Sequence, residues 1–435
     1  MSQPLHILLP SDVFPPRAGG AGWSAAALAQ ALQSRGHQVT ALVPQRGQSG
    51  ISRRVEGGIA VIDVGYTAPN LPFLANIGRF ERFWPRFAAV IVQAAAGLDR
   101  RRLVIHGQHL QGIGAAVLAG QQLGVPVVAT VRDHWPSHYF GTGLHGDTVP
   151  LDHFGVAATA TDLIARQGPL AGVAALLALP YVLGHMQQRR AWLAQCAAVV
   201  SLSGYITRRL VPLVAPNRLH PIPNLVDIPA IDRVVASPPQ TQVAGPFLLF
   251  ASKVARNKGA YLLPEVMAAF RQAGGTATLL LAGGNDPALV AAIRATGAAV
   301  QTLDWADHDE ILRLMARCQA LVFPSTWGEP LSRVLLEACA VGVPIAAMPT
   351  GGTPDLLTHG INALLAPTAC GLGQALAALV QLPHLADQLA AGARHTAETR
   401  LDAPVVAAQM EQLYGTLIAE NAAGAEPDSD LAPWR

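Results

Sequence analysis

Two glutamates that differ in their setting follow one short apolar run in the last third of the chain. Residues 320–323, Ala-Leu-Val-Phe, predict a buried strand, and the Pro and Gly residues of 324–330 indicate that it ends in a turn. Apolar residues at helical spacing come next, so Glu329 lies on the loop after the strand and Glu337 about two turns into a helix. Ligands of open α/β sheets bind at the carboxyl ends of strands, and helix-opening amides bind anions. Two carboxylates flanking such a site could hold the hydroxyl groups of a sugar and a ribose while the amides hold phosphate.

The spacing of Glu329 and Glu337 resembles the Glu-x7-Glu motif of the retaining glycosyltransferases of family 4, which have the GT-B fold. Further segments continue the likeness in the same order, with Gly-Val-Pro-Ile at 342–345 and Gly-Gly-Thr-Pro-Asp at 351–355. The resemblance covers nearly the whole chain apart from 136–183 and the C-terminal tail. It implies an α/β protein of the GT-B class, in which two Rossmann-like doubly wound domains face a central cleft.

The same resemblance implies roles for the residues around the two glutamates. Family members carry basic residues on the loop after the first strand of the second domain, and Lys253 and Lys258 match those positions. Two cations at the donor diphosphate would neutralise the charge on the departing nucleotide without a metal ion. Glu337 would bind the ribose, and Glu329 would hold the donor sugar and share the catalytic role with Lys258. Backbone amides at the mouth of the helix would complete the donor site, at Leu331, Ser332 and Arg333.

A glycine-rich stretch lies between a predicted first strand at 5–10 and a helix at 24–34. Gly19 and Gly20 permit close approach of an anionic group to backbone amides. The spacing does not match the Gly-x-Gly-x-x-Gly pattern, so a dinucleotide site is disfavoured. In the resembling family this loop faces the donor phosphates across the cleft. A plain flexible turn is the alternative.

Polar residues follow two further predicted strands, at 103–105 and 127–131. His106 and His109 come after the first strand, and Arg-Asp-His at 132–134 comes after the second. Such clusters at strand ends are typical of ligand sites. The resemblance places the acceptor at this rim, and we predict catalytic roles for His106 and His109. Position 132 holds Arg where the family more often has His, which leaves the acceptor-side residue open. The His spacing is not a recognised zinc set, so no metal is expected.

Composition sets the remaining expectations. A chain of 435 residues predicts two or three domains, and a net charge of +2 gives no reason to expect a nucleic-acid partner. The N-terminus lacks a signal-peptide pattern, and Cys196, Cys318, Cys339 and Cys370 lie far apart, so we expect reduced cysteines in a cytoplasmic protein. The apolar stretch 169–180 is shorter than the ~20 residues of a membrane span and predicts a helix packed against a domain. It leaves open a peripheral contact with the inner face of a membrane.

The predicted domains are an acceptor-side domain at 1–225 and a nucleotide-sugar domain at 226–401. A helix at 402–420 then crosses back to the first domain, and a flexible tail follows at 421–435. We expect a retaining glycosyltransferase without a cofactor, a monomer or homodimer, that takes a UDP- or GDP-linked sugar donor and a carbohydrate or lipid-linked acceptor. Two alternatives remain: a nucleotide-sugar epimerase on the same fold, and a sugar-nucleotide-binding protein without catalytic activity.

Overall fold

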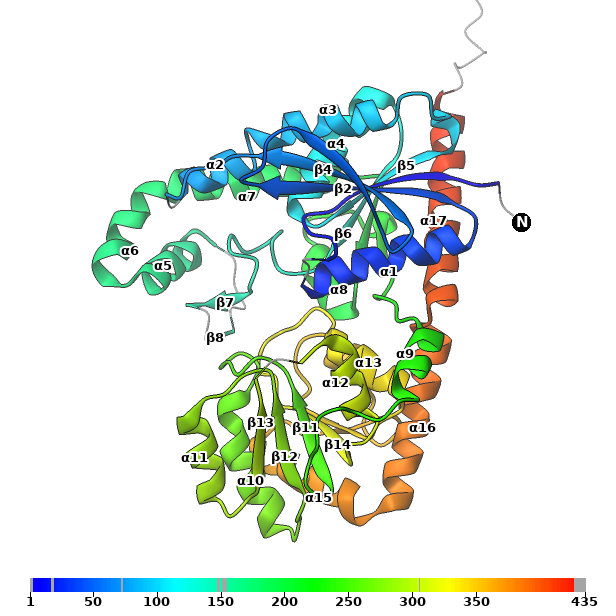
Figure 1. Cartoon of the computed structure of the whole chain (residues 1–435). Helices are drawn as coiled ribbons and strands as arrows, with labels where there is room; N and C mark the ends of the chain where they lie inside the picture. Colours follow the sequence, from blue (N-terminus) through cyan, green and yellow to red (C-terminus); the bar gives the residue numbers. More distant parts are fainter. Residues whose placement is uncertain are drawn as a thin grey trace, which may run out of the picture.

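The computed structural model describes residues 3–16, 19–71, 73–146, 149–150, 155–304 and 306–425. Two α/β domains face each other, with the N-terminal domain in the upper half of Figure 1 and the C-terminal domain in the lower half. Each domain has a mainly parallel sheet with helices packed on it, which confirms the predicted class of two doubly wound domains. Residues 426–435 of the predicted tail lie outside the described residues.

The N-terminal sheet has the strand order β10-β9-β6-β5-β1-β2-β4-β3, and its pairings are parallel apart from that of β3 with β4. Parallel sheets are covered on both faces, which explains why whole strands of this sheet are buried; β6, for example, is buried throughout and apolar except for Thr130. The strands are β1 (His6–Pro10), β2 (Gln38–Arg46), β3 (Ile51–Glu56), β4 (Ile59–Tyr66), β5 (Leu103–Gln108), β6 (Val127–Val131), β9 (Ala198–Ser201) and β10 (Leu219–Pro221).

Helices cover both faces of this sheet, and a helical extension projects from one end of it in Figure 1. A small antiparallel ribbon, β7 (Leu144–His145) with β8 (Val149–Pro150), lies below that extension. The helices are α1 (Gly20–Ser34), α2 (Leu74–Arg79), α3 (Phe83–Ala94), α4 (Leu110–Leu123), α5 (Val156–Gln167), α6 (Pro169–Ala175), α7 (Leu179–Gln195) and α8 (Gly204–Leu210).

The C-terminal sheet has the strand order β13-β12-β11-β14-β15-β16 and is parallel throughout. Its strands are β11 (Phe247–Ala251), β12 (Thr278–Ala282), β13 (Val300–Leu303), β14 (Ala320–Phe323), β15 (Ile345–Ala347) and β16 (Leu364–Leu365). The helices of this half are α9 (Ile228–Val235), α10 (Leu263–Gln272), α11 (Pro287–Ala295), α12 (His308–Met315), α13 (Arg333–Val341), α14 (Thr353–Leu356), α15 (Ala369–Gln381) and α16 (Pro383–Arg400).

The chain passes between the domains at two points that lie side by side. The N–H of Val226 donates to the carbonyl of Leu401, and the N–H of Ala403 donates to the carbonyl of Val226, both at 2.9 Å. The last helix, α17 (Ala403–Ala425), then runs up the N-terminal domain and buries Met410 and Tyr414 in the core beneath β1 and α1. The C-terminal helix is therefore part of the N-terminal core.

Candidate active site between the two domains

Lys258 and Glu329 meet in a salt bridge at the carboxyl end of the C-terminal sheet. The Nζ atom of Lys258 lies 2.8 Å from Oε1 of Glu329, and the hydroxyl of Ser325 donates to the same oxygen at 3.0 Å. The ammonium group also lies 4.6 Å from the ring centroid of Trp327, a cation–π contact. Glu329 is only 7% exposed. The structure thus brings together the two residues that the sequence predicted on separate loops.

Three loops interlock beneath this pair, and glycines make the fit possible. Gly259 has a φ of +72°, and a Cβ atom there would overlap the carbonyl oxygen of Pro324. Gly351 has a φ of +57°, and a Cβ atom there would overlap the backbone of Glu329. The N–H of Gly352 donates to the carbonyl of Glu329 at 2.7 Å. Residues with side chains rarely adopt positive φ, so local sterics explain why glycine follows Lys258 and why a Gly-Gly pair stands at 351–352.

The N-terminus of α13 opens just after Glu329, at the predicted amides of 331–333. Ser332 is the N-cap residue in an extended conformation, and its side chain makes no capping hydrogen bond. The first-turn N–H groups of a helix lack partners within the helix and carry the positive end of its dipole. Since Ser332 does not cap them, these groups suit an anion such as a phosphate.

Glu337 is held inside α13 by two basic side chains. Its Oε1 atom lies 2.7 Å from Nε of Arg333 and 2.7 Å from Nε2 of His308, and the residue is 3% exposed. A buried carboxylate needs such partners because burial without them costs several kcal/mol. Glu337 is therefore not a solvated helix residue, and its carboxylate is fixed in one position.

Three further predicted donor contacts are exposed. Lys253 forms no ion pair with the carboxylates that the structure describes. Gly19 is the N-cap of α1 and Gly20 is its first residue, four residues earlier than predicted. A Cβ atom on either glycine would meet nothing within 4 Å, so the packing of this chain does not require glycine there. The preceding residues 17–18 lie outside the described part of the chain.

A second charged cluster forms where β1, β5 and β6 end side by side in the N-terminal domain. His109 is the N-cap of α4, with Nδ1 3.1 Å from Oδ2 of Asp12 and Nε2 2.7 Å from Oδ2 of Asp133. Burial alone would lower the pKa of His109, but the charges and hydrogen bonds of Asp133 and Asp12 outweigh it and raise the pKa to about 10. At neutral pH the ring is therefore an imidazolium clamped between two carboxylates. The sequence interpretation missed Asp12, whose signal is an acidic residue just past the end of β1.

This cluster lines a pocket of about 210 Å³, which also contains Arg79, Phe80 and Arg189. A neighbouring pocket of about 380 Å³ shares three of its lining residues and extends toward the end of α5. The shared wall mixes aromatic rings with an amide and consists of Asn76, Tyr139 and Phe140. Aromatic surface beside hydroxyl-binding polar groups is typical of ligand pockets.

His106 does not occupy the predicted catalytic position, and this prediction is corrected. Strand β5 continues to Gln108, so His106 lies inside the sheet with no exposed surface. Its Nδ1 atom lies 2.6 Å from the hydroxyl of Tyr414, and its Nε2 atom lies 2.7 Å from Oγ1 of Thr130. Burial and the charge of Arg132 lower the pKa of His106 to about 3, so the ring is neutral. His106 ties α17 to the sheet and cannot touch a substrate.

Arg132 stands where the resembling family more often has His, and the structure gives it defined partners. Its guanidinium donates to the side-chain oxygens of Gln108 and Asn224. Burial, together with the charge of Arg333 across the gap between the domains, lowers the pKa of Arg132 to about 9. Two arginines from opposite domains thus repel each other across this gap. An anion between them would relieve that repulsion.

The domains touch around the loop 324–330, which carries Glu329. His134 is buried, and its Nε2 atom donates to the carbonyl of Gly328 at 2.8 Å. Burial lowers the pKa of His134 to about 4, so the ring is neutral at physiological pH. The indole N–H of Trp327 donates to the carbonyl of Thr142 from the N-terminal domain. His134 therefore holds this loop and is not among the residues that line the pocket beside His109.

The part of the chain that the structure describes contains no group of three or more His, Cys, Asp or Glu residues arranged to hold a metal ion. All four cysteines are free, and Cys370 is exposed while Cys196, Cys318 and Cys339 are buried.

Lysine is rare in this protein, with Lys253 and Lys258 as the two lysines of the sequence. Both lie on the loop after β11.

Comparisons with known proteins give the family of each domain. The family model described as "Glycosyl transferases group 1" matches residues 245–382, and that described as "Glycosyltransferase Family 4" matches residues 18–229. The putative glycosyltransferase YtcC of Bacillus subtilis is 29% identical over 133 residues, which span 27% of this chain and 31% of YtcC. Alpha-maltose-1-phosphate synthase of Mycobacterium tuberculosis is 26% identical over 264 residues, which span 53% of this chain and 67% of that protein.

Solved structures resemble the chain over both domains. Anabaena Alr3699/HepE in complex with UDP has a TM-score of 0.63 at 18% identity and covers 95% of this chain and 100% of that one. Sucrose-phosphate synthase (tll1590) from Thermosynechococcus elongatus has a TM-score of 0.66 at 20% identity and covers 96% of this chain and 100% of that one. With one family model on each domain and this shared architecture, the chain belongs to the group 1, family 4 glycosyltransferases of the GT-B fold.

Proposed function

We propose that this glycosyltransferase is a retaining enzyme that moves a sugar from a UDP- or GDP-linked donor to an acceptor hydroxyl without a metal ion or other cofactor. The observation that carries the proposal is the Lys258–Glu329 pair beside the uncapped N-terminus of α13. Negative charge grows on the diphosphate as the sugar–phosphate bond breaks, and preorganised cations and amides stabilise such charge. Lys258 supplies the cation, and the amides of 331–333 supply the donors.

The rest of the donor follows from this placement. Glu337 binds the ribose hydroxyls with its fixed carboxylate, and Glu329 accepts hydrogen bonds from hydroxyls of the transferred sugar. Arg333 and the exposed Lys253 add positive charge at the two ends of the diphosphate, and the loop at Gly19–Gly20 approaches it from the other domain. Anabaena Alr3699/HepE, which shares the fold, was solved in complex with UDP, and this supports a uridine donor here.

The acceptor binds in the pocket beside His109, where the carboxylates of Asp12 and Asp133 accept hydrogen bonds from hydroxyl groups. His109 cannot act as the base, because its two carboxylate partners keep it protonated at neutral pH. This supports attack on the same face of the sugar as the leaving group. The acceptor oxygen bonds to the anomeric carbon, the sugar–phosphate bond breaks, and the acceptor proton passes to the departing phosphate oxygen.

A donor panel tests this proposal. Purified protein is incubated with UDP- and GDP-sugars, with and without carbohydrate and glycolipid acceptors and with and without EDTA. We expect nucleotide release that depends on the acceptor, is insensitive to EDTA, and gives a product whose anomeric configuration by NMR equals that of the donor. Inversion would contradict retention. Conversion of the donor sugar without an acceptor would indicate an epimerase, and nucleotide binding without turnover would indicate a silent binding protein.

A further inference from the structure

A helical hairpin on the N-terminal domain exposes large apolar side chains. We call residues 155–178 the apolar hairpin; it consists of α5, α6 and the short 3-10 turn after α6, and it projects from the left end of the domain in Figure 1. Leu170 is 90% exposed, Leu177 88% and Val173 60%. Single exposed apolar residues are normal, but three within eight residues on a projecting element indicate an interaction surface.

The hairpin is not a spanning segment. The helical path Leu170–Gln195 is long and apolar enough to cross a membrane by length and composition. Its second half, however, is bound into the domain. Arg189 is buried and donates to the carbonyl of Tyr139 at 2.8 Å, and His185 lies 2.6 Å from the carboxylate of Glu81. The geometry therefore leaves only the α6 end of this path available to an external partner.

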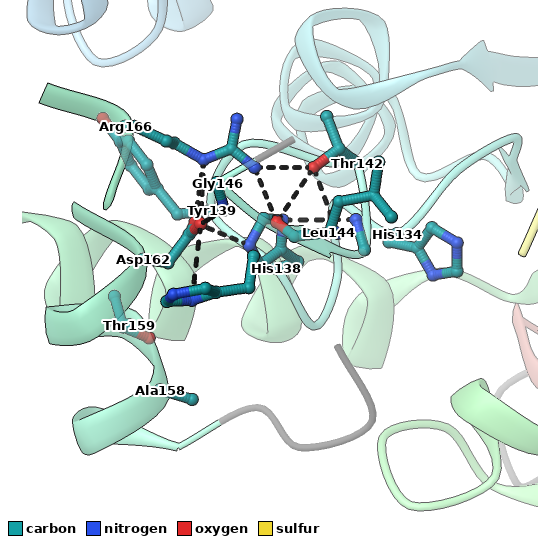
Figure 2. Close-up of polar contacts among 12 residues, drawn as sticks. His134, His138, Tyr139, Thr142, Leu144, Gly146, Ala158, Thr159, Asp162 and Arg166 are labelled. Atoms are coloured by element: carbon teal, nitrogen blue, oxygen red, sulfur yellow. Dashed lines mark hydrogen bonds and ion pairs between the residues drawn. The ribbon is translucent and has the colours of Figure 1, made fainter. Parts of the chain in front are cut away.

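A polar network holds the apolar hairpin rigidly on the domain (Figure 2). Asp162 of α5 is buried, accepts from the N–H of Gly146 at 2.8 Å and lies 2.9 Å from Nε2 of His138. Arg166 contacts the same carboxylate at 2.9 Å and donates to the carbonyl of Leu144 at 2.6 Å. The hairpin is thus fixed to the loop that forms one wall of the acceptor pocket.

Charge decides which partner fits. Residues 1–225 hold 18 arginines, no lysine and 9 acidic residues, a net charge of +9. With Glu411 and Glu420 of α17, which packs on the same domain, the domain carries +7, whereas the whole chain carries +2.

Arg82 and Arg86 are exposed at the start of α3. Glu81, which precedes Arg82, accepts a hydrogen bond at 3.3 Å from the hydroxyl of Tyr181, three residues past the end of the hairpin. The nearby carboxylate of Glu81 is already engaged by His185. A second copy of this domain would bring equal positive charge to the contact, whereas an anionic surface complements it.

We propose that the N-terminal domain docks on an anionic lipid bilayer through the apolar hairpin. Leu170, Val173 and Leu177 enter the interface between headgroups and acyl chains, and Arg82 and Arg86 contact the headgroups. Apolar anchoring combined with basic residues is how proteins lie on a membrane without spanning it. The 380 Å³ pocket includes Gln167, at the turn between α5 and α6, so docking through the hairpin brings this pocket close to the lipid surface. The docking itself does not depend on the proposed reaction.

Vesicle sedimentation tests the proposal without an activity assay. The full chain is mixed with vesicles of phosphatidylcholine alone, or with roughly 30 mol % phosphatidylglycerol, an anionic surface that attracts basic residues. We expect binding to the anionic vesicles that weakens with salt, and little binding to the neutral ones. Leu170→Ser/Val173→Ser/Leu177→Ser is expected to abolish binding. Arg82→Gln and Arg86→Gln are expected to weaken it about fivefold each.

Controls separate docking from unfolding and from self-association. Ile361→Ser/Leu382→Ser removes apolar residues that are 62% and 53% exposed on the other domain, and it is expected to bind as the unchanged protein does. The hairpin residues are exposed, so UDP affinity and circular dichroism are expected to stay the same in the triple variant. The proposal is overturned if the unchanged protein ignores anionic vesicles, or if the triple and arginine variants bind as well as it does. A hairpin-dependent dimer that does not bind vesicles would also overturn it.

Discussion

Replacing Lys258 with methionine removes the charge at the proposed donor site while keeping most of the side-chain volume. At 2.8 Å from Glu329, the attraction is about 6 kcal/mol for an effective dielectric of about 20, and desolvation offsets most of it. Loss of one partner from a fully buried pair costs about 3–5 kcal/mol. The side chain of Lys258 is 23% exposed, so we expect a smaller loss of unfolding free energy, about 2 kcal/mol.

The effect on catalysis should be larger than the effect on stability. Removing one group that stabilises developing charge costs about 10²–10³-fold in kcat. Glu329→Gln removes the partner carboxylate, so the double variant should lose less than the sum of the two single losses. Steady-state nucleotide release from the best donor gives kcat and KM, and urea unfolding gives the stability of the same four proteins.

Arg256→Gln is the matched control, because it removes a cation from the same loop. Arg256 is exposed and packs 5.0 Å from the ring centroid of Tyr261, away from any carboxylate contact that we observe among the described residues. Its kcat should change less than about threefold, since surface substitutions away from special features have small effects. A Lys258→Met enzyme with kcat within threefold of the parent, or single losses that add fully in the double variant, would refute the reasoning.

Three further predictions use the same structure. Lys253 and Lys258 are the two lysines of the sequence, so acetylation of each can be followed by mass spectrometry with the α-amino group as reference. UDP at about ten times its Kd should slow acetylation of Lys258 about tenfold. Unchanged labelling would contradict the proposed donor site. The pKa of His134 is lowered to about 4, so its stabilising contribution is present above about pH 6.5 and is lost as the pH falls toward 4. Over this range the unfolding free energy of the parent should drop by about 3 kcal/mol more than that of His134→Gln. Equal pH slopes in the two proteins would argue against this. Gly259→Ala should lower the unfolding free energy by more than about 2 kcal/mol. Gly415→Ala in α17, where a Cβ atom meets nothing within 4 Å, should raise it by up to about 1 kcal/mol. Equal shifts in melting temperature for the two variants would reject the steric argument.

The arrangement of Glu329 and Glu337 was largely predictable from the sequence because its signals are local. An apolar strand, a turn with Gly and Pro, and a helix fix where Glu329 and Glu337 lie relative to each other. Strand β14 has the predicted bounds, and α13 starts at Arg333, within the predicted helix mouth. The salt bridge of Lys258 was not predictable, because it depends on β11 and β14 being neighbours in the sheet.

The cluster at the end of the N-terminal sheet was harder to predict because it depends on contacts between distant segments. Asp12, His109 and Asp133 converge only because β1, β5 and β6 are adjacent in the sheet order. His106 was misplaced because β5 runs three residues past the predicted strand, and its partner Tyr414 is 308 residues away in α17. The apolar stretch at 169–180 was predicted to pack on a domain, but the structure leaves Leu170 and Leu177 exposed.

The most direct test is a crystal structure with an intact UDP- or GDP-sugar or a non-transferable analogue. We expect the diphosphate to lie within hydrogen-bonding distance of Nζ of Lys258 and of an amide at 331–333. We also expect Glu337 to contact the ribose and Glu329 to contact the sugar. A diphosphate bound elsewhere, with Lys258 and the N-terminus of α13 unoccupied, would contradict the account.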